Sequence, residues 1–207
     1  MITSKLIVVL ISGKAGVGKT TLANLLKTDL KTRGKDSVII PFASSLKQVA
    51  KSMGWDGEKD ERGRTLLQGL GTIGRKYDPN IWIDLSYQNA FDYAVRSGTH
   101  FFLTDDWRFP NEYDRLSENP SFQVFRFRIC APKREILRGT PQYNDISETA
   151  LPECFTPESE AYYDLEVGNY GTMDELYMTA GSVVQYLLDN CQKWQVEDTI
   201  YKENYGR

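Results

Sequence analysis

The segment from Gly13 to Thr20 has the residue types and spacing of a phosphate-binding loop. It reads GKAGVGKT and matches the pattern GxxxxGK(S/T) in full. Glycines let consecutive backbone N–H groups turn inward around an anion, and a following helix adds the positive end of its dipole. In such a loop Lys19 places its charge on the β- and γ-phosphates, and the Thr20 hydroxyl ligates Mg²⁺. The segment therefore predicts binding of ATP with Mg²⁺.

A strand and a helix flank this loop, as the pattern requires. Leu6–Ser12 is a continuous run rich in Val and Ile, which is typical of a strand covered on both faces. Lys19–Arg33 carries leucines at helical spacing, and Gly34 ends it. A glycine-rich turn that binds nothing is the alternative interpretation. The strand, loop and helix in this order argue against it.

The rest of the chain alternates strand-like runs with helical patterns, which is typical of an α/β fold with a parallel sheet. Further strands are predicted at Ser37–Phe42, His100–Thr104, Phe122–Ile129 and Tyr163–Val167. Helices are predicted at Ala43–Met53, Thr65–Tyr77 and Asp78–Ser97, and after a capping box of Thr172 and Glu175. We expect one three-layer domain, residues 1–207, with about five parallel strands and helices on both faces.

Two regions are predicted to handle substrate. Residues 43–98 include a helix with several glycines, which we interpret as sites of close backbone approach and as part of an acceptor-binding region. Residues 132–160 form an insertion whose length is typical of a lid. Arg134 and Arg138 lie four apart on a short helix opened by Pro132, so they share a face and are placed to neutralise charge over the triphosphate. An ordinary solvated helix face is the alternative.

The composition is ordinary for a soluble globular protein of 207 residues, with 41% hydrophobic and 26% charged residues. Net charge is −3, so bulk electrostatic binding to nucleic acid is disfavoured. The longest apolar run, Leu6–Ile11, is much shorter than the roughly 20 residues of a membrane span, and no signal-peptide cleavage site follows it. We therefore expect no nucleic-acid or membrane partner and a cytoplasmic protein.

The cysteines and the histidine carry no recognisable chemistry. Cys130, Cys154 and Cys191 form no CxxC pair, and His100 is the single histidine. This usage predicts neither a zinc site nor a disulfide and favours a reducing compartment. Cys130 is interpreted as a buried residue in or beside the fourth strand, and His100 as structural or exposed.

Several further motifs occur in a fixed order. They are FASSLK at 42–47, LLQGLGTIGR at 66–75 with PNIW at 79–82, DDWRFPNE at 105–112, SET at 147–149 and NYGT at 169–172. Together they resemble the phage-type deoxynucleoside monophosphate kinases, over about residues 7–188. One departure is Asp145, where that family often has histidine. The resemblance implies transfer of the ATP γ-phosphoryl group to a deoxynucleoside monophosphate (dNMP), which gives dNDP and ADP.

Ligands of α/β sheets collect beyond the carboxyl ends of the strands, so these motifs are expected to converge on one crevice. Asp106, with Asp105 beside it, is predicted to hold Mg²⁺ near Thr20, and the resemblance favours Asp106. A lone aspartate is more often a helix cap or a turn residue. Two aspartates at a strand end opposite a phosphate-binding loop favour the metal.

The acceptor monophosphate needs cations, and Arg108 and Arg75 are the main candidates because guanidinium chelates phosphate oxygens. A solvated surface cation is the alternative for each. Phe42 and Trp82 each have two possible roles, stacking on the acceptor base or packing in the core. Asn111 and Glu112 are candidates for substrate contact, and the alternative is that they start a helix. A further alternative for Glu112 is that it orients Arg108. The candidate acceptor-binding residues are Phe42, Lys47, Gln68, Thr72, Arg75, Trp82, Arg108, Asn111 and Glu112.

The remaining candidates complete the set. The candidate ATP-binding residues are Gly13, Lys14, Ala15, Gly16, Val17, Gly18, Lys19, Thr20, Thr21 and Asn169, the last by resemblance alone. The candidate catalytic residues are Lys19, Arg108, Arg134 and Arg138. Arg126 and Arg128 share a face of the fourth strand, and we interpret one of them as structural.

An ionised acceptor oxygen attacking the γ-phosphorus needs no general base, in agreement with the lack of histidine in the motifs. Two alternatives stay open: another small-molecule kinase, acting on dephospho-coenzyme A or a nucleoside, and a non-catalytic ATP-binding module. The exposed face of a helix carrying Trp82 or Trp194 is a candidate surface for a homodimer.

Overall fold

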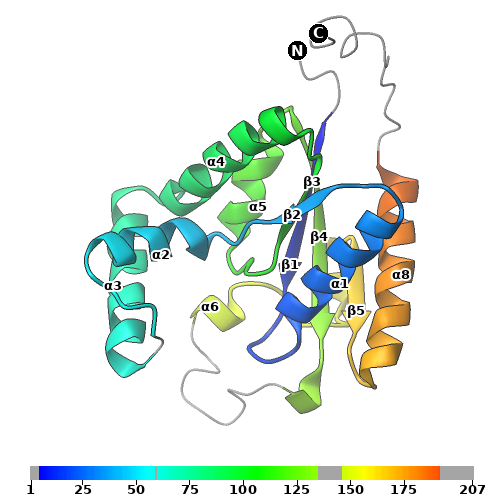
Figure 1. Ribbon diagram of the computed structural model, residues 1–207. Helices are drawn as coiled ribbons and strands as arrows, with labels where there is room; N and C mark the ends of the chain where they lie inside the picture. The colour runs from blue at the N-terminus through cyan, green and yellow to red at the C-terminus, as the bar shows by residue number, and fades with distance from the viewer. Residues whose placement is uncertain (1–4, 59, 135–145, 192–207) are drawn as a thin grey trace, which may run out of the picture.

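The computed structural model describes residues 5–58, 60–134 and 146–191. Five parallel strands form one sheet in the order β2-β3-β1-β4-β5 (Figure 1). Their bounds are β1 Leu6–Ser12, β2 Ser37–Ile39, β3 Phe101–Thr104, β4 Phe122–Cys130 and β5 Leu165–Gly168. The α/β prediction with a parallel five-stranded sheet is confirmed.

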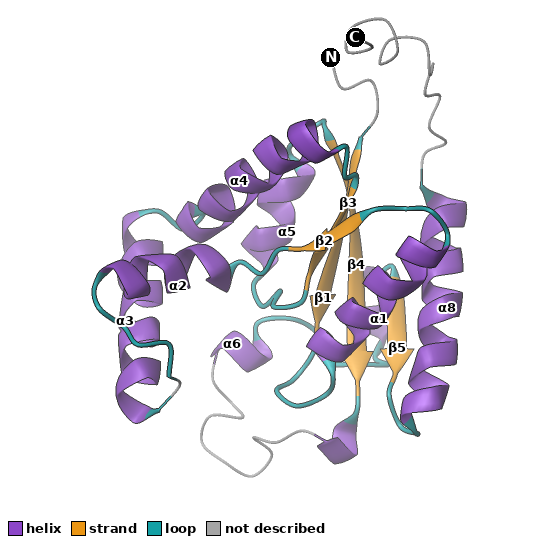
Figure 2. Ribbon diagram, viewed as in Figure 1, coloured by secondary structure: helices purple, strands orange, loops and turns teal. Residues whose placement is uncertain are grey.

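Helices cover both faces of this sheet, as Figure 2 shows. On one face, Ile7, Val9 and Ile11 of β1 belong to a buried cluster shared with α1 (Lys19–Thr32) and α8 (Met173–Asn190). On the other face, the alternate β1 side chains pack in a second cluster with α4 (Ile81–Ser97) and α5 (Pro110–Ser117). The alternation follows from the two-residue period of a strand. The central strand is therefore buried on both faces, and this packing fixes the position of the loop that follows it.

Two helices between β2 and α4, α2 (Ala43–Ser52) and α3 (Glu61–Tyr77), extend to one side of the sheet (Figure 1). The start of α3 lies four residues before the predicted one, because the Asp60 carboxylate accepts a hydrogen bond from the Gly63 N–H at 2.7 Å. A Cβ atom on Gly74 would lie 2.5 Å from the Trp82 ring. This glycine therefore permits close packing of α3 on α4, and buried Trp82 serves that packing.

The two edge strands differ from their predicted bounds. The second strand ends at Ile39, not Phe42, because the backbone N–H groups of Phe42 and Ala43 leave the sheet to donate to Asp106. The fifth strand begins at Leu165, not Tyr163, because the Tyr163 N–H still caps the preceding helix α7 (Pro157–Tyr162). Similarly, Pro79 precedes α4, which begins at Ile81.

The capping box of Thr172 and Glu175 is present at the start of α8, as predicted. A short 3-10 helix η1 (Pro132–Arg134) follows β4, and α6 (Ile146–Thr149) precedes α7. Among the helices of the described residues, none is long and apolar enough to cross a bilayer.

The prediction that the chain carries no disulfide is wrong. Cys130, the last residue of β4, is bonded to Cys154 across a sequence separation of 24 residues. Neither spacing nor motif indicates this pair, because the tertiary fold alone brings the end of β4 to the segment before α7. The cysteine usage therefore no longer argues for a reducing compartment. Cys191 is the free cysteine of the three.

Candidate nucleotide-binding site

The loop between β1 and α1 has the backbone conformation of an anion-binding nest. Gly13, Gly16 and Gly18 have φ values of 151°, 86° and 104°, which favour glycine. A Cβ atom on Gly13 would also lie 2.6 Å from the Ile129 carbonyl oxygen of β4. Gly18 forms the N-cap of α1, so the unpaired N–H groups of that helix face the same loop.

Lys19, the first residue of α1, folds back over the loop. Its Nζ donates to the carbonyl oxygens of Gly13 at 2.6 Å and Lys14 at 2.9 Å. Burial, with the nearby Arg108 guanidinium, lowers the pKa of Lys19 to about 8. A phosphate that replaced these carbonyl partners would find a desolvated cation already in place.

The Thr20 hydroxyl donates to the Asp105 carboxylate at 2.5 Å. Asp106 faces elsewhere and accepts from the N–H groups of Phe42 and Ala43 at 2.8 and 2.9 Å, and burial raises its pKa. The structure thus brings Asp105 to Thr20 and uses Asp106, which the resemblance favours, to cap α2. Hydroxyl and carboxylate oxygens are ligands that Mg²⁺ prefers, so Thr20 and Asp105 fit a Mg²⁺ site.

Arg108 reaches this loop from the segment after β3, with Glu148 of α6 between them. The Arg108 guanidinium donates to one Glu148 carboxylate oxygen at 2.5 Å, and the Ala15 N–H donates to the other at 2.9 Å. Lys14 Nζ donates to the Glu148 carbonyl oxygen at 2.7 Å and pairs with Glu153 at 2.8 Å. Three segments distant in the sequence therefore meet at the carboxyl edge of the sheet.

The structure describes some of the predicted ATP-side residues that lie outside the loop. Asn169 is buried after β5, and its amide donates to the Val17 carbonyl oxygen of the loop at 2.9 Å. Arg134 donates to the Asn169 side chain at 3.2 Å and to the Gly171 carbonyl oxygen. Thr21 is half-buried in the first turn of α1. Arg138 and Asp145 lie outside the described residues.

Among the predicted acceptor-binding residues, Arg75 of α3 lies against the segment that carries Arg108. Its guanidinium carbon is 5.3 Å from the centre of the Phe109 ring. Gln68 and Thr72 are exposed on the same helix, and Lys47 is half-buried on α2. These residues belong to the acceptor-binding region predicted from the sequence.

Four other acceptor candidates make structural contacts. Phe42 is buried in the second cluster and Trp82 packs on α3, which is the alternative interpretation of each. Asn111 donates to Pro79 and Asn80 at 3.2 and 3.1 Å. Glu112 accepts from the N–H groups of Arg108 and Phe109, and burial raises its pKa to about 7. Glu112 therefore begins α5 and fixes the backbone of Arg108.

Sequence reasoning assigned no role to Glu148, Glu153 or the Lys14 side chain beyond the motif. The SET motif was the one available signal for Glu148, and it does not indicate a contact with Arg108. The sequence pattern places Arg128 on the fourth strand and does not indicate that its side chain is buried near this site, at 3% exposure.

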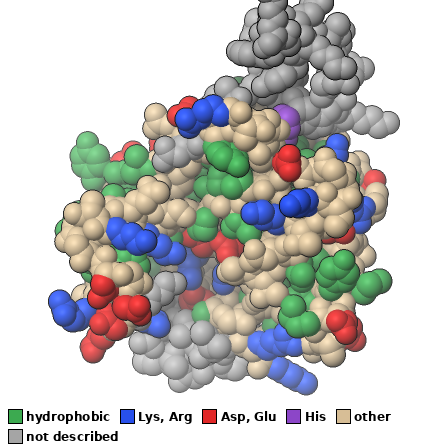
Figure 3. All heavy atoms as spheres, viewed as in Figure 1, with side chains coloured by type: hydrophobic (Ala, Val, Ile, Leu, Met, Phe, Trp, Pro, Cys, Tyr) green, Lys and Arg blue, Asp and Glu red, His purple; other side chains and the backbone are tan. Residues whose placement is uncertain are grey.

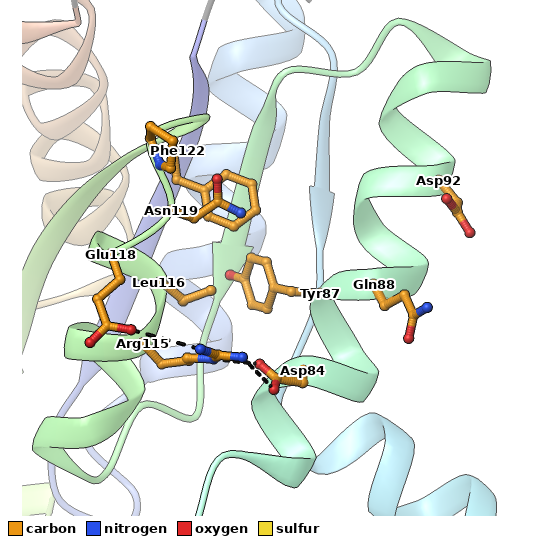
Figure 4. Close-up of a pocket in the computed structure, with 10 residues that line it drawn as sticks. Asp84, Tyr87, Gln88, Asp92, Arg115, Leu116, Glu118, Asn119 and Phe122 are labelled. Carbon is orange, nitrogen blue, oxygen red and sulfur yellow. Dashed lines mark hydrogen bonds and ion pairs between the residues drawn. The ribbon is translucent and has the colours of Figure 1, made fainter.

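Two hollows mark the surface. Figure 3 shows a hollow near the centre of one face, with Lys, Arg, Asp and Glu side chains inside it. A separate groove of about 710 Å³ lies between α4 and α5, near the start of β4, at the opposite edge of the sheet from the phosphate-binding loop (Figure 4). None of the predicted site residues lines that groove.

A parallel α/β sheet with a glycine-rich phosphate-binding loop after its central strand defines a P-loop NTPase. The chain belongs to the family described as the KAP family P-loop domain, whose sequence model matches residues 1–112. That match spans slightly more than half of the 207 residues and includes the loop and both aspartates.

Two curated relatives share parts of the sequence. The uncharacterized protein ORF77 of Ictalurid herpesvirus 1 (strain Auburn) is 30% identical over 142 residues, covering 69% of this chain and 58% of that protein. The septum site-determining protein MinD of Escherichia coli (strain K12) is 31% identical over 105 residues, covering 48% of this chain and 39% of MinD. The chain thus spans less than two thirds of the length of these relatives.

Two solved structures resemble the fold at low identity. The Cys556Ala mutant of the Mycobacterium tuberculosis APS kinase CysC superposes with a TM-score of 0.46 at 14% identity, covering 89% of this chain and 99% of that one. A gluconokinase from Sinorhizobium meliloti 1021 superposes with a TM-score of 0.46 at 17% identity, covering 90% and 95%.

Proposed function

We propose that this protein is a deoxynucleoside monophosphate kinase, which transfers the γ-phosphoryl group of ATP to a dNMP and releases dNDP and ADP. The observation that carries this proposal is the meeting of Arg108 with the phosphate-binding loop through Glu148. A guanidinium at this position can hold a second anionic substrate next to the γ-phosphate.

In this proposal the loop N–H groups and Lys19 hold the ATP phosphates. Thr20 and Asp105 would hold Mg²⁺, which supplies positive charge to the phosphate oxygens. Asn169 ties the segment after β5 to the loop, next to the region where the resemblance implies the adenine ring. Arg134 orients Asn169 and is, with Arg138, the source of further positive charge.

The acceptor monophosphate lies between Arg108 and Arg75 in this arrangement. Both arginines flank Phe109, so a phosphate held by them is fixed relative to the loop. The exposed face of α3 with Gln68 and Thr72 is then available to the deoxyribose and the base. The attacking oxygen is already ionised at pH 7, so positioning and charge neutralisation supply the catalysis.

The test is a coupled ADP-release assay with a panel of dNMPs, nucleosides and dephospho-coenzyme A as acceptors. We expect acceptor-dependent ADP release with dNMPs only. Release with a nucleoside or with dephospho-coenzyme A would assign the chain to another kinase class. ATP binding without turnover on any acceptor would show a non-catalytic module.

Arg108→Met refines the same assay. We expect the KM for the dNMP to rise by about tenfold or more, with the KM for ATP changing far less, since one charge-assisted phosphate contact is lost. Arg115→Met, which removes an exposed arginine of α5, is the matched control. An effect of Arg108→Met confined to ATP would contradict the acceptor assignment.

A further inference from the structure

The Glu148 carboxylate occupies a position suited to a phosphate group. It is bound by a backbone N–H of the phosphate-binding loop and by the Arg108 guanidinium, at 2.9 and 2.5 Å. Both are donors that bind phosphate oxygens equally well. The Glu148 side chain is 4% exposed, so its charge is almost fully removed from water. A carboxylate here behaves as an internal anion seated in the loop.

Arg128 provides a second and independent observation. It is 3% exposed, and its Nε and Nη2 have no hydrogen-bond partner among the described residues. Its nearest carboxylate, Glu153, is 4.0 Å away and is itself more than half exposed. Arg128 pairs in the sheet with Ser12, the last residue before the loop. Buried guanidinium groups are normally fully paired, because unmet donors are costly in a dry site.

The surrounding charges do not complete this pairing. Glu153 already pairs with Lys14 at 2.8 Å, and Glu148 is engaged with Arg108. Arg128 and Arg108 both lie close enough to Lys19 to lower its pKa. Positive charge therefore accumulates around the loop, and a polyanion is the ligand that would satisfy it.

We propose that Arg128 is a phosphate-binding residue of the nucleotide site, and that Glu148 is an internal anion which a phosphoryl group of the nucleotide displaces from the Ala15 N–H, so that Arg108 is released for the acceptor. The proposal rests on the nucleotide site of the proposed function and adds two residues to it. Two anions cannot share one set of donors without strong repulsion, so phosphate entry and Glu148 departure are coupled. Because Lys14 holds the Glu148 carbonyl oxygen, the exchange needs only the Glu148 side chain to rotate.

The test compares the affinity of the full chain for inorganic tripolyphosphate and for ATP, measured by calorimetry. Glu148→Gln keeps the size of the side chain and removes its charge, and we expect it to tighten tripolyphosphate binding by about three- to tenfold. Arg128→Met removes the guanidinium with its two unmet donors, and we expect it to weaken binding by about tenfold or more. Arg128→Met is also expected to change the ligand-free melting temperature little, since it removes two unmet donors together with a 4.0 Å ion pair to Glu153 and a contact over the Tyr163 ring.

Matched controls exist on the same elements. Arg126→Met alters the same face of β4, where Arg126 is paired with Asp164 at 3.1 Å, and is expected to leave tripolyphosphate affinity unchanged. Glu118→Gln removes an exposed carboxylate and is expected to do the same. Unchanged or weaker binding in Glu148→Gln overturns the internal-anion role. Unchanged binding in Arg128→Met, with a lower melting temperature, would show that Arg128 is merely structural and would overturn its proposed role in phosphate binding.

The two proposals fail in different ways. If the wild-type chain binds tripolyphosphate and the variants change affinity as expected, but no acceptor is phosphorylated, the kinase proposal fails and this inference stands. If dNMP-dependent turnover is present and both variants bind like wild type, this inference alone fails.

Discussion

Two arginines on neighbouring segments pair with carboxylates in opposite surroundings. Arg108 meets Glu148, whose side chain is 4% exposed, whereas Arg115 meets Asp84 with both side chains more than 40% exposed. The Arg115 pair borders the groove between α4 and α5 (Figure 4). Water screens it, so its charges cost little and respond weakly to anything nearby.

At the phosphate-binding loop Arg108 is still 36% exposed, but the Glu148 carboxylate is almost fully desolvated, so its charge depends strongly on its neighbours. Lys19 shows this in its pKa of about 8, and Arg128 in its unmet donors. A ligand that brings negative charge would raise the pKa of Lys19 and supply hydrogen-bond acceptors to Arg128 at the same time. The difference between the two regions therefore indicates that a bound anion would change the electrostatic energy far more at the phosphate-binding loop than at the groove between α4 and α5.

Lys19→Ala should have the largest effect. Loss of this desolvated cation is expected to reduce ATP affinity and turnover by about a hundredfold or more, because its contact with phosphate is charge-assisted and shielded from water. Calorimetry and the ADP-release assay measure this. Lys27→Ala, an exposed lysine of the same helix, is the control. Turnover near that of wild type would remove Lys19 from the mechanism.

Local sequence signals predicted most of the fold. β1 has its predicted bounds, Leu6–Ser12, and the box of Thr172 and Glu175 begins α8, because apolar runs and caps act within a few residues. The bounds of the edge strands depend on contacts with distant residues. The early end of β2, for example, follows from Asp106, which lies more than sixty residues further along.

The candidate site likewise has one part that local sequence signals predict and another that depends on tertiary contacts. The loop could be identified from its spacing, because one short segment supplies the whole nest. The partners of Lys14 and Arg108 in residues 147–153, and the choice of Asp105 over Asp106 as the neighbour of Thr20, arise from tertiary convergence. Adjacent aspartates point to different sides of the chain, and no pattern in the sequence says which side faces the loop.

Cys154→Ser tests the disulfide bond near the phosphate-binding loop. No disulfide joins the described residues that line the groove between α4 and α5. The bond between Cys130 and Cys154 closes a loop that contains Glu148 and Glu153. Its removal is expected to lower the free energy of unfolding by about 3 kcal/mol, from the greater chain entropy of the unfolded state. Denaturant unfolding without reductant measures this change.

The reductant supplies an internal control for that variant. Wild type should lose a similar stability when reduced, whereas Cys154→Ser should be insensitive to reductant. Cys191→Ser should keep the sensitivity of wild type, because Cys191 is the free cysteine. Equal stability of wild type with and without reductant would contradict a structural disulfide.

The pH dependence of ATP affinity gives an effect of intermediate size. Lys19 must be protonated to bind phosphate, and its pKa in the free protein is about 8. Affinity is therefore expected to be level below pH 8 and to fall by up to about tenfold per pH unit above it. Lys19→Ala should flatten this profile. A wild-type profile that stays level from pH 7 to pH 10 would show that the charge of Lys19 does not contribute.

The smallest expected effect compares the two arginine pairs directly. Arg115→Met removes an exposed pair and should shift the melting temperature by less than about 2 °C. Arg108→Met leaves the buried Glu148 carboxylate bound by the Ala15 N–H but without its cationic partner, so the shift should be clearly larger and downward. Equal shifts in the two variants would mean that burial does not distinguish the pairs, and the contrast between loop edge and groove would be lost.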